Sequence, residues 1–316
     1  MRRLKVAVVG VGAWGKNHAR TLSSLPEAEL VAVCDSNVER AERVGHEFGV
    51  EFYGDYKRLL LRRDVDAVSV CTWATGLASV ALNVLRAGKH VLVEKPMAAN
   101  IKDAKHIVAL AERERLCLTV GLLTRFIPEV PYIKKLIVDG EFGNVVCATA
   151  RRVSQWPERI GDVGVVKDIA VHDIDITRFL FGEDPVAVYA KVGKMHHVGF
   201  EDYAQVMLDF RNEKTAFIEA NWITPYKART LIVTGSKCVA TLDYMTQEVR
   251  VDSDKLSCIP RFEVVEPLKL ELQSFVEAVL NNRQPVVTGE DGIKALMVAE
   301  AALKSAAKNR VVKLNF

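Results

Sequence analysis

The chain has 316 residues, too many for one ordinary hydrophobic core and suited to two domains. Hydrophobic residues make up 49% and charged residues 26%, which excludes a disordered, collagen-like or low-complexity chain. The net charge is only +3 with both signs interspersed, so we expect neither nucleic acid nor a membrane surface as a partner.

Six cysteines are scattered through the chain, and none forms a C-x-x-C pair. Disulfide frameworks are typical of short secreted chains, so we expect free thiols and a reducing, cytoplasmic location. The uncharged segment 67–85 contains several hydroxyl and amide side chains. We interpret it as a strand, a loop and a helix rather than a membrane span. The apolar N-terminal stretch runs directly into glycines and is not interpreted as a signal peptide.

Residues 1–121 alternate between short apolar strands and helices. In chain order we expect strand 4–9, helix 16–25, strand 30–34, helix 38–48, a short helix reaching 61, strand 67–71, helix 77–86, strand 91–93, helix 101–113 and strand 116–120. Asp55 is placed to cap the short helix. This alternation predicts an α/β Rossmann domain, with a parallel sheet and helices on both faces.

Residues 122–316 have a different pattern. We expect helix 131–138, strand 145–153, helix 165–181, strands at 186–192, 203–210, 215–222, 229–234, 238–242 and 248–251, and then helices 268–280 and 291–307. Consecutive strands without helices between them predict an α+β domain with a large, mostly antiparallel sheet. We assign this domain to substrate binding and oligomerisation. An open sheet face needs a cover, so we expect a homodimer or homotetramer through it.

A glycine motif, G-V-G-A-W-G, follows the first strand and precedes a helix. Gly10 allows a tight turn, Gly12 lets the backbone approach a pyrophosphate, and Gly15 permits close packing of the helix. Asp35 ends the second strand about 20 residues later, where an acid binds the ribose hydroxyls. The motif therefore predicts dinucleotide binding. Asp35 favours NAD over NADP, although Arg40 could help to bind a phosphate.

The segment A-G-K-H-V-L-V-E-K-P contains a lysine directly after an apolar strand. Lys95 is thereby expected at the carboxyl edge of the sheet, where open α/β folds bind ligands. The alternative is an ordinary solvated lysine.

A third group of polar residues lies on the predicted helix 165–181. Asp168 and His172 are four residues apart and share a face, and Asp175 follows one turn later. A carboxylate beside an imidazole can fix its tautomer and raise its basicity, as a general base requires. A structural pair or two metal ligands are the alternatives. No cysteine or glutamate has matching spacing, so we predict no metal.

Together, the glycine motif, the Glu94-Lys95-Pro96 step and Asp168 with His172 resemble the Gfo/Idh/MocA oxidoreductases. The resemblance covers essentially the whole chain. It implies that Lys95, Asp168 and His172 are the catalytic lysine, aspartate and histidine, and that the Lys95–Pro96 peptide is cis. The sequence departs from the family pattern at Trp73, Leu77 and Leu122, which weakens the assignment of a substrate.

Two segments, starting at Arg151 and Glu219, resemble the branch of that family that oxidises C3 of UDP-N-acetylglucosamine. They contain five basic residues suited to a diphosphate: Arg151, Arg152, Arg159, Lys227 and Arg229. The alternative is solvated charge on the strands of a sheet.

The motifs and the resemblance give two sets of candidate ligand contacts. The cofactor set is Gly10, Gly12, Ala13, Trp14, Gly15, Asp35, Ser36, Arg40, Thr72, Trp73, Glu94, Lys95 and Arg125. The substrate set is Lys95, Arg125, Arg152, Trp156, Arg159, Asp168, His172 and Lys227.

These sets lead to a functional hypothesis: NAD-dependent oxidation of a secondary hydroxyl of a sugar or nucleotide sugar, with C3 of UDP-N-acetylglucosamine expected first. A dehydrogenase of another sugar or a polyol, of the inositol or glucose type, is an alternative. An enzyme that retains and recycles its NAD is another. A non-catalytic NAD-responsive binding protein has no need of the Lys95, Asp168 and His172 set and is disfavoured.

Overall fold

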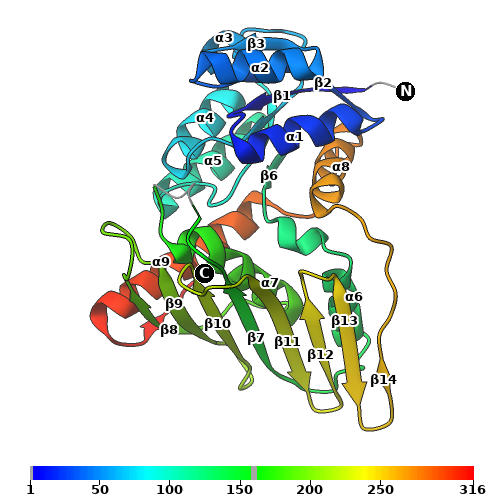
Figure 1. Ribbon diagram of the computed structural model, residues 1–316, viewed down its shortest axis with the longest axis vertical. Helices are drawn as coiled ribbons and strands as arrows, with labels where there is room; N and C mark the ends of the chain where they lie inside the picture. Colours follow the sequence, from blue (N-terminus) through cyan, green and yellow to red (C-terminus); the bar gives the residue numbers. More distant parts are fainter. Residues whose placement is uncertain (1–2, 158–161) are drawn as a thin grey trace. The chain divides into compact units, whose positions relative to one another are not determined.

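The computed structural model describes residues 3–157 and 162–316 (Figure 1). The chain divides into two compact units, which are described separately. The first unit runs to Leu122 and also includes Glu266–Ile293. The second contains Leu123–Val265 and Lys294–Phe316. The fold class predicted from the sequence, a Rossmann domain followed by an α+β domain, is confirmed.

A six-stranded parallel sheet forms the centre of the first unit, in the order β3-β2-β1-β4-β5-β6. Its strands are β1 (Leu4–Val9), β2 (Ala28–Cys34), β3 (Glu51–Tyr53), β4 (Ala67–Val70), β5 (His90–Val93) and β6 (Leu118–Val120). The order reverses between β1 and β4, and open α/β sheets bind ligands beyond the carboxyl ends of the strands at such a point. The sequence did not predict β3, which is short and largely exposed at the sheet edge.

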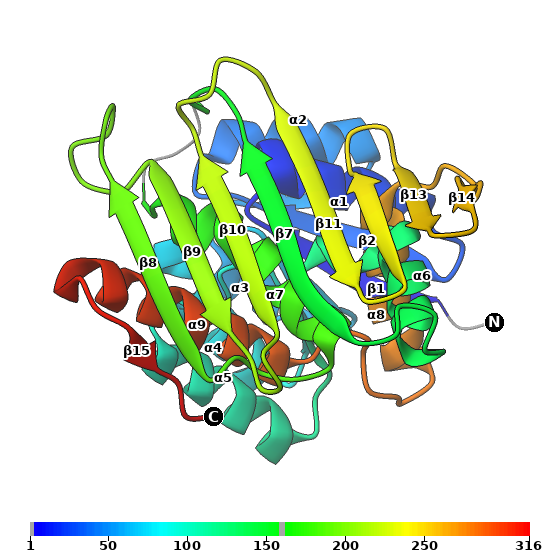
Figure 2. The ribbon, with the colours of Figure 1, turned by 90° about the horizontal axis from the view of Figure 1, so that it is seen from below.

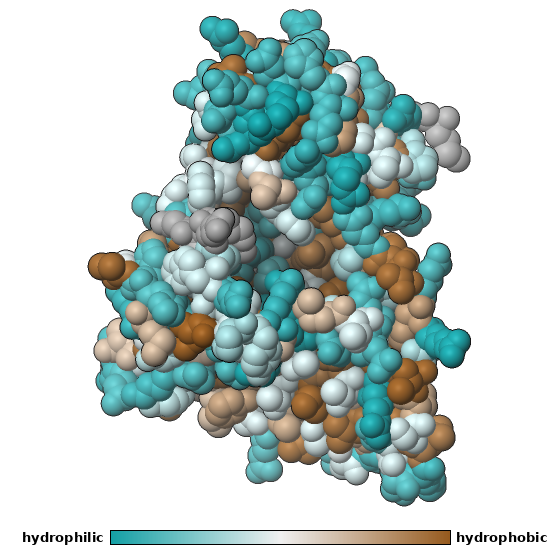
Figure 3. Space-filling model, in the orientation of Figure 1, coloured by the Kyte–Doolittle hydropathy of each residue, from teal (hydrophilic) through white to brown (hydrophobic). Residues whose placement is uncertain are grey.

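The helices of the first unit are α1 (Ala13–Ser24), α2 (Val38–Phe48), α3 (Tyr56–Leu60), α4 (Ala74–Arg86), α5 (Ile101–Glu114) and α8 (Pro267–Leu280). Local signals set their ends: the Asn37 and Asp55 side chains cap α2 and α3, and Gly49 ends α2 with a φ of 66°. The outer surface over α2 and α3 is mainly hydrophilic (Figure 3), as expected for helices that bury one face.

Helix α8 corrects one boundary predicted from the sequence. Residues 266–293 were assigned to the second domain, but they pack with the first unit, where α8 contacts α1 and β1. Leu272, Phe275 and Val276 form its buried face. Helical periodicity identifies such an apolar face, but it does not say which core the face completes.

The second unit contains a nine-stranded sheet in the order β14-β13-β12-β11-β7-β10-β9-β8-β15 (Figure 2). Its strands are β7 (Val145–Val153), β8 (Ala187–Gly193), β9 (Tyr203–Asp209), β10 (Thr215–Asn221), β11 (Ala228–Gly235), β12 (Cys238–Asp243), β13 (Glu248–Ser253), β14 (Ser257–Cys258) and β15 (Val312–Lys313). Only the pairing of β7 with β10 is parallel among the described strands of this sheet.

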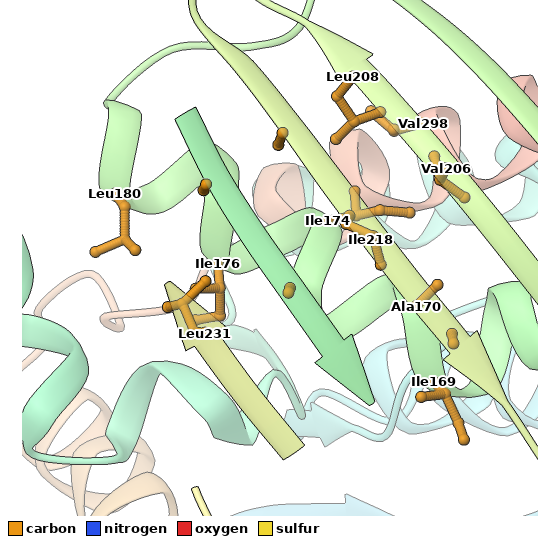
Figure 4. Close-up of a cluster of buried hydrophobic side chains, with 14 of the residues drawn as sticks. Ile169, Ala170, Ile174, Ile176, Leu180, Val206, Leu208, Ile218, Leu231 and Val298 are labelled. Atoms are coloured by element: carbon orange, nitrogen blue, oxygen red, sulfur yellow. The ribbon is translucent and has the colours of Figure 1, made fainter. Parts of the chain in front are cut away.

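One face of this sheet is covered by helices and forms the core (Figure 4). The second unit contains the 3₁₀ helix η1 (Leu123–Phe126), α6 (Glu129–Val138), the π-helical turn η2 (Val166–Ala170), α7 (Val171–Phe181) and most of α9 (Gly289–Lys308). Ile174 of α7, Val298 of α9 and Ile218 of β10 belong to one buried cluster. The chain therefore fixes α7 against the centre of the sheet. Among the described residues, no helix is long and apolar enough to cross a membrane.

Candidate active site

The three glycines in and after the turn that follows β1 differ in how much space surrounds them. A Cβ on Gly10, which has a φ of 88°, would lie 2.6 Å from the Cys71 carbonyl oxygen. A Cβ on Gly15 would lie 1.7 Å from the Gly10 oxygen. A Cβ on Gly12 would have only the Arg40 Nη1 nearby, at 3.9 Å. The protein's own packing therefore requires Gly10 and Gly15, whereas Gly12 leaves open space at the start of α1.

That open space lies in front of a helix N-terminus suited to an anion. Gly12 caps α1 without a side-chain hydrogen bond, and the first turn contains no acidic residue. Ala13 and Trp14 begin the helix, and Trp14 is 40% exposed. The backbone N–H groups and the helix dipole are thus available to a pyrophosphate, so these residues fit the dinucleotide that the glycine motif predicts.

Asp35, after β2, is held by the backbone around it. Its carboxylate accepts hydrogen bonds from the N–H groups of Val11 (2.9 Å) and Asn37 (2.9 Å). The Arg40 guanidinium lies 3.3 Å from Oδ2. Ser36 beside it is exposed. A fixed carboxylate at this position suits ribose hydroxyls, and its pairing with Arg40 reduces the charge that Arg40 would offer to a 2′-phosphate.

Thr72 and Trp73 follow β4, on the other side of the point where the strand order reverses. Trp73 caps α4 and is 62% exposed, a large exposure for an indole. The Thr72 hydroxyl donates to the Trp73 carbonyl oxygen at 3.3 Å. An aromatic side chain held out at this edge is suited to lie along a ligand, and contact of Trp73 with the cofactor stays a prediction.

The Glu94-Lys95-Pro96 step follows β5. The buried Glu94 carboxylate accepts hydrogen bonds from the Trp14 indole (2.8 Å), the His18 imidazole (3.1 Å) and the Lys95 backbone N–H (3.2 Å). Burial alone would raise the pKa of Glu94, but His18 and the Lys95 charge hold it below its ordinary value. Lys95 is half-buried rather than fully solvated, and the Lys95–Pro96 peptide is cis, as the resemblance implied.

Two buried residues that interact with Glu94 were missed by the sequence reasoning. His18 of α1 is fully buried against Glu94, and Glu271 of α8 is buried near both. A signal for Glu271 was present, because it interrupts the apolar face formed by Leu268, Leu272 and Phe275. No pattern in a single sequence brings residues 18, 94 and 271 together.

In the second unit, Asp168 and His172 lie on one continuous helical segment. Asp168 belongs to the π turn η2, in which the Val171 N–H donates to the Val166 carbonyl oxygen, and His172 lies in the first turn of α7. Asp168 is buried and His172 half-buried. π turns inside helices occur often at functional sites. The helix predicted over 165–181 is present, but with this wider turn at its start.

Two of the arginines predicted to contact ligands are held in buried ion pairs. Arg125 of η1 binds both oxygens of Asp175, at 2.8 and 2.6 Å. Arg152 of β7 binds both oxygens of Asp173, at 2.9 and 2.8 Å, and lies over the Tyr244 ring. Planar bidentate pairs of this kind are geometrically specific. Their visible role is to fix α7, and ligand contact by either arginine stays a prediction.

A cationic cluster lies at the end of β7 and the start of β11. Arg152 and Arg229 are directly opposite in the register of these strands, and Lys227 precedes β11. Repulsion from Arg229, together with partial burial and the nearby Arg152, lowers the pKa of Lys227. Cationic side chains gathered at the end of one strand and the start of its neighbour are suited to an anionic ligand.

The remaining predicted substrate residues have separate environments. Trp156 stacks on His197 and packs edge-on against Trp222. Arg151 instead pairs with Glu219, at 2.8 Å. Arg159 lies outside the described residues. Within residues 3–157 and 162–316, no cluster of His, Cys, Asp and Glu side chains is suited to hold a metal ion.

Comparison with protein-family models gives two matches in the order of the two domains. Residues 4–122 match the oxidoreductase family with an NAD-binding Rossmann fold, and residues 130–241 match the GFO/IDH/MocA C-terminal domain. The chain belongs to the Gfo/Idh/MocA oxidoreductase family. The predicted family, the NAD cofactor and the assignment as an oxidoreductase are thereby confirmed.

Two sequence comparisons and one structural comparison show which enzymes this Gfo/Idh/MocA oxidoreductase is similar to. It is 29% identical to an inositol 2-dehydrogenase of Rhizobium meliloti, over 98% of this chain and 99% of that one. It is 28% identical to a UDP-N-acetylglucosamine 3-dehydrogenase of Acidithiobacillus ferrooxidans, over 96% of each chain. A solved structure of a UDP-N-acetylglucosamine 3-dehydrogenase from the same organism has a TM-score of 0.89, with 26% identity, 97% of this chain and 99% of that chain covered. Similarity alone therefore does not separate the two substrate classes.

Proposed function

We propose that this enzyme oxidises a secondary hydroxyl group of a sugar or polyol and transfers the hydride to NAD. Relatives that are 28–29% identical along almost the whole chain are named for this chemistry. The open glycine turn, the fixed carboxylate of Asp35 and the half-buried Lys95 fit a nicotinamide dinucleotide and a reacting group beside it. Bound NAD would supply the hydride acceptor.

In the proposed mechanism the residues of the chain accept the proton of the substrate hydroxyl and stabilise the negative charge that develops on its oxygen. His172 takes the proton of the substrate hydroxyl, and Asp168 holds the imidazole in the required tautomer. Lys95 donates a hydrogen bond to the same oxygen and stabilises the negative charge that develops on it. A positioned base of this kind contributes roughly 10²–10⁴-fold to the rate.

The substrate we propose is UDP-N-acetylglucosamine, oxidised at C3. The observation that carries this choice is the pair of Lys227 and Arg229 at the start of β11, where repulsion from Arg229 lowers the pKa of Lys227. A diphosphate would relieve that repulsion, and arginine and lysine are the side chains that bind phosphates. A neutral polyol offers no such compensation.

A polyol such as myo-inositol is the second candidate, because inositol 2-dehydrogenases are as similar to this chain as the UDP-sugar enzyme. The two candidates share the proton chemistry of His172 and Lys95. They differ in whether Lys227 and Arg229 contact the substrate.

The deciding experiment measures NADH formation with NAD and UDP-N-acetylglucosamine, with myo-inositol, glucose and UDP-glucose in parallel. We expect turnover of the UDP-amino sugar. The Lys227→Met variant should raise its KM by about tenfold, the effect of about 1.4 kcal/mol. Lys255→Met, at an exposed lysine of the β13–β14 turn, is the matched control and should change nothing. Turnover of myo-inositol alone would overturn the UDP-sugar assignment.

The catalytic assignment has its own test. His172→Ala should lower kcat by roughly 10²–10⁴-fold while the Kd for NADH stays within about threefold of wild type. Wild-type turnover in this variant would refute the role of His172. NAD that remains bound through purification, with no net NADH formed, would instead indicate an enzyme that recycles its cofactor.

We also propose that the enzyme is a homodimer or homotetramer, assembled through the open face of the nine-stranded sheet. The exposed side chains Met207 of β9 and Phe217 of β10 are directly opposite in register, and Ile232 of β11 lies on the far side of β7. Sedimentation of the wild type and of Phe217→Asp tests this, and a monomeric wild type would contradict it. The six free cysteines suit the reducing cytoplasm that we propose as its location.

A further inference from the structure

A group of polar side chains is buried inside the first unit, directly behind the Glu94–Lys95 step. His18 comes from α1, Ser69 from β4, Glu94 from the end of β5 and Glu271 from α8. All four are buried, and His18 and Ser69 have no exposed surface. Four separate elements therefore contribute to a polar group that is shielded from solvent. Of its members, only Glu94 is among the predicted ligand contacts.

Glu94 is the centre of this group, because both of its carboxylate oxygens accept hydrogen bonds. Oε1 accepts from the Trp14 indole and from Nε2 of His18, and Oε2 accepts from the Lys95 N–H. On the other side, a Cβ on Gly121 would lie 2.7 Å from Oε1, so the carboxylate fits closely against the backbone there. The side chain of Glu94 is thus held by the start of α1 and in turn holds the backbone at Lys95.

The charges in the group have a definite arrangement. Burial alone would lower the pKa of His18, but the Cys71 sulfur and the Glu94 carboxylate raise it well above its ordinary value. Burial and repulsion from Glu94 raise the pKa of Glu271 well above its ordinary value, which favours the neutral form of this acid. The opposite pKa shifts of His18 and Glu94 favour a charged pair at the 3.1 Å contact between Nε2 and Oε1, with the neutral form of Glu271 favoured beside it.

Stability does not explain such a pair. Removing two charges from water costs about as much as their attraction returns, and apolar replacements of buried ion pairs are often neutral or stabilising. Neither oxygen of Glu271 has a hydrogen-bond partner in the described part of the chain, which adds to the cost. What the arrangement does provide is a single, charged hydrogen bond that fixes the position of Glu94.

We propose that His18 is a positioning residue for Lys95. It acts through Glu94: the His18 imidazole binds one carboxylate oxygen, and the other oxygen accepts a hydrogen bond from the Lys95 backbone N–H. Because Trp14 of the glycine motif binds the same oxygen as His18, one carboxylate links the cofactor turn to the lysine. The inference rests on the proposed function in that Lys95 is taken to contact the reacting oxygen.

Two substitutions at position 18 separate positioning from simple packing. His18 uses Nε2 for Glu94 and Nδ1 for Ser69, at 2.9 Å. The glutamine amide reaches as far as Nε2, so His18→Gln keeps a donor to Glu94. The asparagine amide reaches only as far as Nδ1, so His18→Asn keeps the Ser69 contact and loses the Glu94 contact. A residue that only fills space would respond to both substitutions alike.

The primary measurement is hydrogen exchange of the Lys95 amide, followed by mass spectrometry on the full chain. His18→Asn should accelerate that exchange by roughly 10–100-fold, the range expected for loss of a hydrogen bond to a charged group. His18→Gln should stay within about threefold of wild type. Leu22→Ala, a buried truncation on the same helix, is the control for general loosening and should raise exchange throughout the first unit without a selective effect at Lys95.

Function is measured on the same variants. His18→Asn should lower kcat with UDP-N-acetylglucosamine or myo-inositol while the Kd for NADH, from fluorescence titration, changes by less than about threefold, and His18→Gln should restore kcat. Equal Lys95 exchange in the two variants would overturn the inference. The exchange experiment needs no substrate, so it stands apart from the proposed function, which fails instead if Lys95→Met retains full turnover.

Discussion

Two glycines of one motif should respond in opposite ways to the same substitution. Gly15→Ala places a Cβ 1.7 Å from the Gly10 carbonyl oxygen, and that oxygen belongs to a backbone turn that cannot rotate away. Gly12→Ala places a Cβ in open space, with one atom of the flexible Arg40 side chain at 3.9 Å. The first substitution therefore disturbs the fold, and the second disturbs only what the fold binds.

The magnitudes follow from those distances. Gly12 has a φ of −64°, which alanine adopts, so Gly12→Ala should change the free energy of unfolding by no more than about 1 kcal/mol. Gly15→Ala should cost at least the roughly 1–3 kcal/mol of ordinary overpacking, because the clash is with backbone. If the pyrophosphate approaches the backbone at Gly12, a methyl group there should weaken NADH binding about 100-fold, equivalent to about 2.7 kcal/mol.

The assay combines urea unfolding with fluorescence titration of NADH for both variants and the wild type. Gly12→Ala should unfold at the wild-type urea midpoint and fail to bind NADH tightly. Gly15→Ala should unfold at a lower midpoint. Tight NADH binding by Gly12→Ala would refute the assignment of this space to the cofactor, and a large loss of stability in that variant would refute the packing argument.

Three further outcomes are expected. Arg152→Met leaves Asp173 buried without its partner, so it should lower the free energy of unfolding by about 3–5 kcal/mol in urea titrations, whereas a mainly ligand-binding Arg152 would change KM with little loss of stability. Glu271 has a raised pKa in the folded chain, so its favourable contribution is complete below the ordinary value of about 4.3 and is lost as the pH rises through the raised pKa. Glu271→Gln should therefore gain stability relative to wild type as the pH rises, and a difference that does not change with pH would contradict this. Asp35→Ser removes a carboxylate beside Arg40 and should increase kcat/KM for NADP relative to NAD by at least about tenfold, measured as the ratio of the two coenzymes under identical conditions.

The sequence was most informative where chemistry depends on neighbouring residues. The glycine motif, Asp35 and the Lys95–Pro96 step lie at strand ends, and strand ends can be predicted from short apolar runs. The alternation of strands and helices up to Gly121 was sufficient to predict the parallel sheet. The same reasoning predicted the helix that carries Asp168 and His172, but not its π turn, because an extra residue within a helical turn leaves no mark in apolar periodicity.

The sequence was least informative where distant segments meet. Helix α8 was predicted, but its packing on α1 depends on long-range contacts that no local pattern encodes. The same limit hid the group of His18, Glu94 and Glu271, whose members come from three separate elements of the first unit. An acidic residue on an apolar helix face, as at Glu271, is the signal that a single sequence offers for such a group.

Two arginines of the second unit that the sequence predicts as ligand contacts have a structural role that it did not predict. Asp173 and Asp175 are two positions apart on α7, so their side chains leave the helix on nearly opposite sides. Arg152 of β7 holds the first and Arg125 of η1 holds the second, each with two hydrogen bonds. Because α7 forms ion pairs on two opposite sides, it cannot rotate about its axis without breaking one of them. The direction in which α7 presents His172 is therefore set by these arginines, whether or not either of them also contacts a ligand.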